Sequence, residues 1–228
     1  MNLMNHTLRA TLLLLSCTLG ARAGALPKAI DSAPCQTPPT IDGVLGGEEW
    51  RDAKVISFEM RMAGLFPPSV EQRPCELRVM NSANALYIAL KIPDEHVNNQ
   101  LSPLDLDMVM LAFCQGDEVK AGDDRKAIAE GIYLDKHVTI PGQDDADDAR
   151  MDGRGSVTYQ KGTYTFEWAV PLNPDYVNDL RAKPGDSVRF NVAYFDAFKP
   201  ALKGTRLGGA YGPELKSAKD WGVIRIAA

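Results

Sequence analysis

Acidic residues are concentrated in one stretch of this sequence. Between Asp117 and Asp152 it holds eleven Asp or Glu residues against five Lys or Arg. Two like charges about 4 Å apart in water repel by roughly 1 kcal/mol, and by more where they are partly desolvated. The folded chain must therefore space these charges widely, pair them with basic side chains or hold a cation among them.

Calcium is a cation that suits this supply, because it takes about six to eight oxygen ligands from flexible, carboxylate-rich loops. The candidate ligands are Asp105, Asp107, Asp123 and Asp124. The spacing of an EF-hand is absent. The alternative is a solvated acidic surface paired with Arg125, Lys126 and Arg150, and residues 144–148 have the pattern of a solvated run. The sequence leaves both interpretations open.

An aromatic, glycine-rich segment after Phe195 is the second candidate site. The candidate ligand-binding residues are Phe198, Tyr211, Asp196, Lys199 and Arg206. The two aromatic rings can stack on the face of a pyranose, and the polar side chains can hydrogen-bond its hydroxyls. Loops at the end of a rigid scaffold often carry function. The alternative is a loop folded over the end of the scaffold with the aromatic rings as lids.

Other kinds of site find less support. After the N-terminal segment only His96 and His137 remain, so one chain has no three-histidine zinc site, and no HExxH motif occurs. A haem would be bound non-covalently, with an axial pair from these histidines, a lysine or a methionine such as Met108 or Met110. Neither a G-x-S-x-G motif nor a distinct carboxylate pair indicates a hydrolase. We therefore expect binding rather than catalysis.

The N-terminus has the pattern of a secretory signal peptide covering residues 1–23. Arg9 supplies a positive charge, residues 10–19 an apolar core and Ala21-Arg22-Ala23 a cleavage site. The apolar run is shorter than the roughly 20 residues that span a bilayer. We expect a periplasmic or secreted protein without a transmembrane segment. A competing interpretation makes Cys17 a site of lipid attachment.

The net charge excludes two classes of partner. The chain has 25 Lys and Arg against 30 Asp and Glu, and removal of Arg9 and Arg22 with the signal leaves 23 against 30, a net charge near −7. Nucleic acids and anionic membrane surfaces call for basic patches. We therefore expect neither as a partner.

Three cysteines remain after the signal peptide. In an oxidising compartment one pair would form a disulfide. We expect Cys35 and Cys75 to pair, because each precedes a predicted strand in a proline-containing segment. Cys114 ends an apolar run and is typical of a buried thiol. No CxxC motif indicates a redox or zinc site.

Short apolar segments separated by turn signals, with little helical period, predict an antiparallel β-sandwich (jelly-roll-like) in a single domain. The domain covers residues 40–228 and follows a proline- and alanine-rich lead-in at 24–39 that shows no period. Strands are expected at residues 40–41, 55–60, 77–80, 86–92, 108–114, 128–135, 138–140, 156–159, 164–170, 187–194 and 221–226. We expect a loop at residues 64–74, one helical turn at 177–181 and a core position for Trp50.

Five motifs, in order along the chain, resemble those of family 9 carbohydrate-binding modules and their relatives. They are Ile41-Asp42-Gly43 with Glu49-Trp50 and Ala53, Ala85-Leu86-Tyr87-Ile88-Ala89, Phe166-Glu167-Trp168-Ala169-Val170-Pro171-Leu172, Pro184-Gly185-Asp186-Ser187-Val188-Arg189-Phe190-Asn191-Val192 and Trp221-Gly222-Val223-Ile224. The resemblance implies a β-sandwich found in exported proteins, often a sugar binder with structural calcium. It also implies kinship with haem-binding sandwiches related to the ethylbenzene dehydrogenase γ-subunit.

Two features differ from the family's pattern. Its best-studied sugar binders clamp the sugar between two exposed tryptophans, whereas all three tryptophans here occupy framework positions. Such modules are also usually attached to an enzyme, whereas we expect this chain to stand alone. The resulting expectation is an exported, non-catalytic protein that binds a saccharide and a structural Ca²⁺. The alternatives are a haem-binding electron-transfer sandwich and an envelope protein-interaction module that uses the apolar surface of residues 55–68.

Overall fold

The computed structural model describes residues 24–64, 68–95, 107–129, 131–140, 144–172, 176–196, 206–212, 215 and 217–228. The predicted signal peptide, with Cys17, lies outside these residues. So do His96, Asp105, Phe198 and Lys199, which the sequence offered as candidate ligands or contacts.

Strands make up the regular structure of the described residues, which contain no helix and hence none that could cross a membrane. The strands are β1 (Ala29–Asp31), β2 (Ala33–Pro34), β3 (Ile56–Gly64), β4 (Ser69–Asn81), β5 (Ala85–Pro93), β6 (Met108–Cys114), β7 (Asp124–Ala129), β8 (Ile132–Ile140), β9 (Asp144–Asp147), β10 (Arg154–Gln160), β11 (Thr163–Pro171), β12 (Ser187–Asp196), β13 (Arg206–Gly209) and β14 (Gly222–Arg225).

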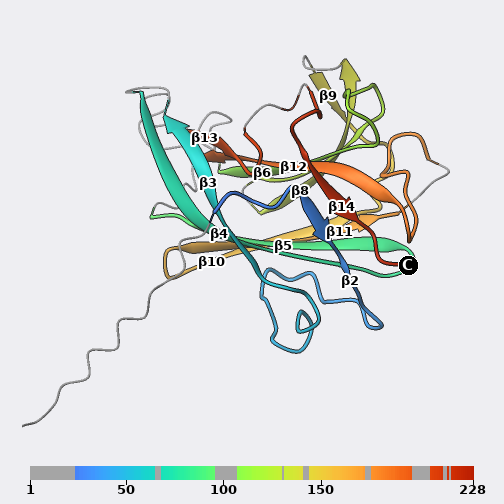
Figure 1. The fold of residues 1–228 in the computed structure, drawn as a ribbon, viewed down its shortest axis with the longest axis horizontal. Helices are drawn as coiled ribbons and strands as arrows, with labels where there is room; N and C mark the ends of the chain where they lie inside the picture. The colour runs from blue at the N-terminus through green and yellow to red at the C-terminus, as the bar shows by residue number, and fades with distance from the viewer. Residues whose placement is uncertain are drawn as a thin grey trace, which may run out of the picture.

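The strands form one antiparallel path that folds over on itself. Its order is β10-β11-β5-β4-β3-β13-β12-β6-β7-β8-β9. The β3–β13 pairing joins two layers, one from β10 to β3 and one from β13 to β9, which face each other in Figure 1. Two additions pair in parallel, β1 with β14 and β2 with β4. The predicted β-sandwich is confirmed.

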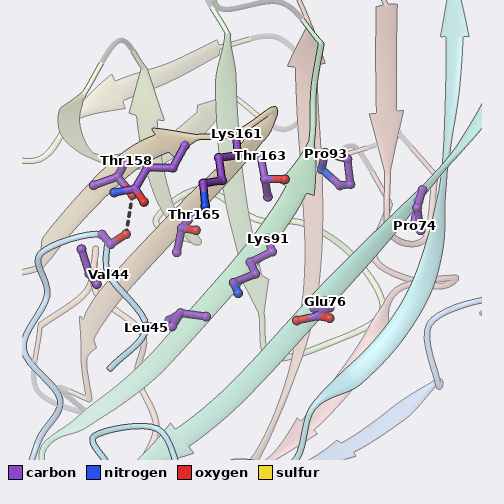
Figure 2. Close-up of a pocket in the computed structure, with 12 residues that line it drawn as sticks. Val44, Leu45, Pro74, Glu76, Lys91, Pro93, Thr158, Lys161, Thr163 and Thr165 are labelled. Atoms are coloured by element: carbon purple, nitrogen blue, oxygen red, sulfur yellow. Dashed lines mark hydrogen bonds between the residues drawn. The ribbon is translucent and has the colours of Figure 1, made fainter. Parts of the chain in front are cut away.

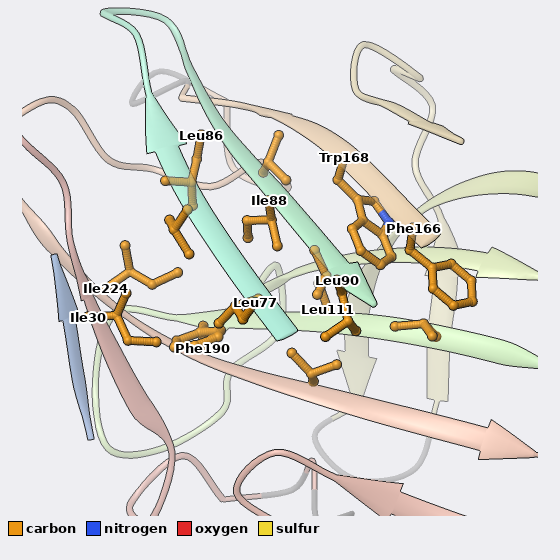
Figure 3. Packing of buried hydrophobic residues seen from close by; sticks show 14 of the residues in the cluster. Ile30, Leu77, Leu86, Ile88, Leu90, Leu111, Phe166, Trp168, Phe190 and Ile224 are labelled. Atoms are coloured by element: carbon orange, nitrogen blue, oxygen red, sulfur yellow. The ribbon is translucent and has the colours of Figure 1, made fainter. Parts of the chain in front are cut away.

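The main core lies between the two layers. The alternation in β11 places Tyr164, Phe166, Trp168 and Val170 on this inner face, as the sequence predicted, and all four are buried. Figure 3 shows the packing of β4, β5 and β11 side chains against those of the facing layer. Burying each large apolar side chain contributes about 1.5–3 kcal/mol. The alternate positions of the same strands point away from this core.

The lead-in at residues 24–39 contributes two short strands, β1 and β2. Ile30 in β1 is 3% exposed and pairs in parallel with Ile224 of β14. Ala33 in β2 pairs with Met80 of β4. The segment has too few residues in each strand to show a period of two, which is why its pattern gave no signal.

Residues 69–74 of the expected loop at 64–74 instead belong to β4, which pairs with β3. Pro74 lies within β4 opposite Glu59, whose own N–H donates away from β4 to Gly24 O at 2.9 Å. Pro74 therefore does not interrupt a β3–β4 hydrogen bond. On the other side of β4, its pairing with β5 ends at Glu76 and Lys91, two residues before Pro74 would meet Pro93. A proline without an N–H is tolerated where the ladder stops.

Three smaller predictions were also wrong. The single strand expected at residues 128–135 is the β7–β8 hairpin, and Gly131 has a φ of +80°, a left-handed value that favours glycine. Residues 40–41 form no strand. Residues 177–181 form a turn rather than a helical turn, held by a bridge between Leu180 and Leu172.

The expected disulfide between Cys35 and Cys75 is absent, and both are free thiols. Cys75 lies in the main core, whereas Cys35 packs on the opposite face of the sheet and bonds to Asn81 at the far end of β4. Six strand residues span about 20 Å, and a disulfide needs Cα atoms within about 7 Å. Burial raises the pKa of Cys75 to about 12. Cys114 is buried, as predicted, and burial raises its pKa to about 11.

Candidate functional site

A groove of about 480 Å³ lies on the outer face of the layer formed by β4, β5, β11 and β10. Figure 2 shows the loop with Val44 and Leu45 on one side of it and the strands beneath. The groove is lined by Gly43, Val44, Leu45, Pro74, Glu76, Lys91, Pro93, Thr158, Gln160, Lys161, Thr163 and Thr165. None of these residues is aromatic.

The floor of the groove is a row of hydrogen-bonding side chains that crosses four strands. Glu76 is the strand partner of Lys91, which is also the partner of Thr165, and Thr165 in turn pairs with Thr158. Directly opposite residues have Cβ atoms about 4.5–5.5 Å apart. The row presents a carboxylate, an ammonium group and hydroxyls side by side, so donors and acceptors alternate along one line.

Glu167 holds the loop that walls the groove. One carboxylate oxygen accepts the N–H groups of Asp42 at 3.0 Å and Gly43 at 2.7 Å, and the other accepts the indole N–H of Trp50 at 2.8 Å. Glu167 and Trp50 are fully buried. Burial raises the pKa of Glu167, and these three donors oppose that rise. The carboxylate therefore fixes the loop against the sheet.

Gly43 is required where this loop meets β10. Its φ is +83°, and a Cβ there would lie 2.8 Å from the Thr158 methyl and 2.9 Å from the Thr158 backbone nitrogen. The Thr158 hydroxyl donates to the Gly43 carbonyl at 2.6 Å, the dashed line in Figure 2. Backbone and side chain are thus in close contact at the groove's edge, where only glycine fits without strain.

A second polar centre, the Arg73 cluster, lies at one end of the sandwich. Arg73 is buried, and its Nε donates to Glu71 at 2.6 Å, one terminal nitrogen to Asp94 at 2.6 Å and the other to Asp196. The Tyr194 hydroxyl donates to Asp94 at 2.5 Å. Each guanidinium nitrogen meets a different carboxylate, an arrangement that suits the forked geometry of arginine.

The charges of this cluster support one another. Burial opposes ionisation of Arg73, but the carboxylates of Asp196 and Asp94 outweigh it and raise the pKa of Arg73. Burial and Asp94 raise the pKa of Asp196, and Arg73 opposes this. Arg206 lies at the rim, 2.9 Å from Glu71 and 3.8 Å from Asp196.

A third centre, the Lys126 cluster, lies inside the sandwich between β7 and β8. The Lys126 amine is in contact with Asp135, lies 2.9 Å from an oxygen of Asp124 and 4.0 Å from Asp179. Tyr133 donates to the second oxygen of Asp135 at 2.9 Å. The amine and all three carboxylates are buried.

Asp124 is the least satisfied member of the Lys126 cluster. It is within ion-pair distance of Lys126, yet neither of its oxygens makes a hydrogen bond of good geometry within the described part of the chain. Burial raises the pKa of Asp124 to about 7, against the lowering influence of Lys126. Burial disfavours the charged form of Lys126, and Asp124 and Asp135 outweigh it and raise the pKa of that amine.

The sequence matches the family model described as carbohydrate family 9 binding domain-like over residues 41–225. The chain belongs to this family. Two of the five motifs, from distant parts of the sequence, meet at Glu167, which binds Asp42, Gly43 and Trp50. The shared motifs of this family member therefore build the wall of the groove.

Solved structures share the fold at low sequence identity. A family 9 carbohydrate-binding module from Caldicellulosiruptor kristjanssonii, in complex with glucose, has a TM-score of 0.59 at 15% identity, covering 88% of this chain and 96% of that one. Its cellotriose complex has a TM-score of 0.58 at 15% identity, with coverage of 88% and 94%. A candidate carbohydrate-binding protein from Bacteroides uniformis has a TM-score of 0.57 at 7% identity, with coverage of 87% and 99%. A search of curated proteins finds no match.

The residues predicted to bind a ligand fall into two places in this family member. Asp196 and Arg206 come together at the Arg73 cluster, where Asp196 is buried in its ion pair. Tyr211 instead packs edge-on against Phe190, with ring centroids 5.6 Å apart, and its hydroxyl donates to the Pro27 carbonyl. Phe190 and Asp196 are six residues apart along β12, or about 20 Å. Phe198 and Lys199 lie outside the described residues.

Of the residues predicted to bind calcium, Asp107, Asp123 and Asp124 are described and have different partners, and Asp105 lies outside the described residues. Asp107 accepts a hydrogen bond from Tyr164 at 2.7 Å, Asp123 accepts one from the Lys120 backbone at 2.6 Å, and Asp124 faces Lys126. In the part of the chain that the structure describes, no three His, Cys, Asp or Glu side chains form a group that could hold a metal. Asp124 is paired with the Lys126 amine.

Sequence reasoning missed Arg73, the Glu167 clamp and the groove row. The period of two in β5 and β11 places Lys91, Thr163 and Thr165 on the face away from the core. That signal marks them as outward-facing but gives no reason to expect a groove. The wall comes from a loop more than a hundred residues earlier in the chain than Thr158 and Thr165, and only the fold brings it there.

Proposed function

We propose that this protein is an exported, non-catalytic carbohydrate-binding protein and that a saccharide lies in the groove across β4, β5, β11 and β10. Membership of the family supports the class of ligand, and two of the solved structures with this fold were determined with glucose and with cellotriose. The secretory pattern of residues 1–23 supports export.

The row of Glu76, Lys91, Thr165 and Thr158 is the observation that carries the proposal. Sugar hydroxyls both donate and accept hydrogen bonds. The row offers the Glu76 carboxylate as an acceptor, the Lys91 ammonium group as a donor and the Thr165 hydroxyl as either. The Thr158 hydroxyl donates to the Gly43 carbonyl and can still accept. Because the four residues are strand partners, the sheet fixes their spacing before any ligand arrives. A volume of about 480 Å³ lies within the usual range for small-molecule sites, about 300–1,000 Å³.

The groove offers small apolar contacts in place of an aromatic platform. Val44, which is 50% exposed, and Leu45 lie on the loop, and Pro74 and Pro93 lie on the floor. A large, flat aromatic ring would give a sugar more apolar contact area than these side chains do. A sugar held by hydrogen bonds and aliphatic carbon alone lacks that contribution, so we expect modest affinity that depends on hydroxyl geometry.

Calorimetry with glucose and cello-oligosaccharides, preceded by a glycan array, tests the ligand class. Thr165→Val keeps the shape of the side chain and removes one hydroxyl, and a typical hydrogen bond contributes about 1 kcal/mol, or roughly fivefold in affinity. Lys91→Ala removes the central donor of the row and should weaken binding further. Both positions are on the outer face, so the variants should keep the wild-type melting temperature.

Arg206→Ala is the matched variant for the alternative location at the Arg73 cluster. If the groove is the site, this change leaves the sugar affinity unaltered. Loss of binding in Arg206→Ala but not in Lys91→Ala would move the site to the loop end, and no binding to any glycan would overturn the proposed function. Melting curves with calcium and with chelator, run on the same samples, test the expected structural Ca²⁺.

A further inference from the structure

Lys126 and Asp135 face each other directly inside the protein. They are strand partners in the β7–β8 hairpin, and the amine of one is in contact with the carboxylate of the other. Both side chains have no measurable exposure to solvent. Ile128, two residues after Lys126 and therefore on the same face of β7, is part of the main core. The pair thus lies at the edge of the apolar interior.

Three further polar side chains surround this pair. The Asp124 carboxylate lies 2.9 Å from the Lys126 amine, and the second oxygen of Asp135 accepts a hydrogen bond from Tyr133 at 2.9 Å. Asp179 adds a third buried carboxylate 4.0 Å from the amine. The Lys126 amine therefore faces the carboxyl of Asp135, which it could attack, and the carboxyl of Asp124, which is close enough to take a proton. Tyr133 donates a hydrogen bond to the carboxyl of Asp135.

We propose that the Lys126 amine and the Asp135 side-chain carboxyl are joined by an intramolecular amide bond. Lys126 gives a proton to a neighbouring carboxylate, and the neutral amine attacks Cγ of Asp135. The C–N bond forms and one C–O bond breaks, so that the departing oxygen leaves as water with two of the three ammonium hydrogens. An ammonium and a carboxylate become an amide and one water molecule, with no change of oxidation state and no co-reactant.

The neighbouring groups have defined parts in this step. Asp124 takes a proton from the amine and returns it to the departing oxygen. The Tyr133 hydroxyl stabilises the negative charge that develops on Oδ2 as the carboxyl carbon becomes tetrahedral. The fold holds the amine against the carboxyl, so the reaction does not depend on an encounter between two molecules. Well-oriented groups in one molecule can react as if each were present at an effective concentration of about 10⁵ M or more.

Burial favours the amide over the ion pair. Two buried charges lose their hydration, and their mutual attraction often fails to recover that cost. The amide is neutral, and the water it releases passes to bulk solvent. The chain contains a matched pair that lacks this condition: Lys136 and Asp147 are also strand partners, 2.6 Å apart, but the Asp147 side chain is 79% exposed. That pair stays hydrated, so we expect it to remain ionic.

Mass spectrometry of the purified, denatured chain tests the proposal. With its termini mapped, the wild-type protein should weigh one water molecule less than its sequence, and a peptide map should show the segments carrying Lys126 and Asp135 joined. Lys126→Arg should have its full sequence mass, and Lys136→Arg should keep the loss of one water. Circular dichroism checks that each variant is folded.

Asp135→Asn gives a stricter test. The same amine can displace ammonia from an asparagine, so a cross-linked Asp135→Asn chain has the same mass as the cross-linked wild type, and Asp135→Ala has its full sequence mass. Full sequence mass for the folded wild-type chain would overturn the proposal. A loss of water mapped to Asp124 or to the Lys136–Asp147 pair would overturn the assignment to Asp135.

Discussion

Two buried cations organise carboxylates in this protein, and they do so differently. Arg73 meets Glu71, Asp94 and Asp196 through three separate nitrogens. Lys126 has one nitrogen for Asp124, Asp135 and Asp179, and the Asp124 oxygens lack well-formed hydrogen bonds in the described structure. A planar fork satisfies several acceptors at once, whereas a point charge does not.

The difference has a chemical consequence. The guanidinium of Arg73 keeps its charge at any pH a protein meets and is a poor nucleophile, so the Arg73 cluster is a permanent ion network. The amine of Lys126 can give up a proton to a buried carboxylate, and a desolvated lysine is then a nucleophile. The same fold therefore contains one charge cluster suited to structure and one suited to proton transfer and bond formation.

Arg73→Met gives the largest expected effect. It leaves Asp94 and Asp196 buried without their cation, and removing one partner of a buried pair costs about 3–5 kcal/mol. We expect a loss at the upper end of that range in the free energy of unfolding, measured by urea denaturation at neutral pH. The two carboxylates come from β5's end and β12, so the loss should appear as destabilisation of the whole sandwich.

Arg225→Met is the control for this change. Arg225 pairs with Asp31 at 3.2 Å, but both side chains are largely exposed, so its loss should cost about 0.5 kcal/mol or less. Arg73→Lys should recover only part of the lost stability, because one amine replaces three donors. Full recovery with lysine would mean that the fork is unimportant and that the two clusters are equivalent.

The layers of the sandwich could be predicted from the sequence, and the clusters could not. Alternation identified the core face of β11 through Phe166 and Trp168, and the family motifs placed the closing strand β14. Alternation also reports only local exposure. Arg73 lies in a segment whose three prolines predicted a loop, and nothing near it in the sequence indicates that Asp94 and Asp196 end beside it.

The acidic stretch between Asp117 and Asp152 also shows what the sequence cannot predict. Its composition called for wide spacing, basic partners or a cation, and Lys126, Lys136 and Arg189 are basic partners in the structure. It could not show that Asp124, Lys126 and Asp135 would face inward, because Lys and Asp in a strand usually mark the solvent side. The β7–β8 register decides this by placing Lys126 opposite Asp135, and register depends on the hairpin at Gly131 rather than on charge.

Asp124→Asn tests the Lys126 cluster through pH. The pKa of Asp124 is raised from 3.8 to about 7, chiefly by burial, which acts whether or not the neighbouring amide forms. Well below pH 4 the carboxyl is protonated in both folded and unfolded chains. As pH rises toward 7 the unfolded chain ionises first, so the wild type should lose stability, by at most about 4 kcal/mol. Asn has no such loss.

The measurement is the difference in unfolding free energy between the two chains across pH 4 to 8, and it should shift in favour of Asp124→Asn as pH rises. Asp147→Asn provides a control of opposite sign, since Lys136 lowers the pKa of Asp147 and the wild type gains from ionising it. Parallel profiles for wild type and Asp124→Asn would show that Asp124 ionises freely, and the contrast between the two clusters would then disappear.

Arg206→Ala should have the smallest effect on the free energy of unfolding. It tests whether Arg206, at the rim, helps to hold the buried carboxylates of the Arg73 cluster. Arg206 is 31% exposed and pairs with Glu71, which is 35% exposed, at 2.9 Å. Water can replace this partner on both sides, so we expect a loss of about 0.5–1 kcal/mol in urea denaturation, far below that of Arg73→Met. An equal loss would mean that Asp196 depends on Arg206, 3.8 Å away, as much as on Arg73. The cluster would then need two cations to hold its buried carboxylates, and the fork of a single arginine would not explain its stability.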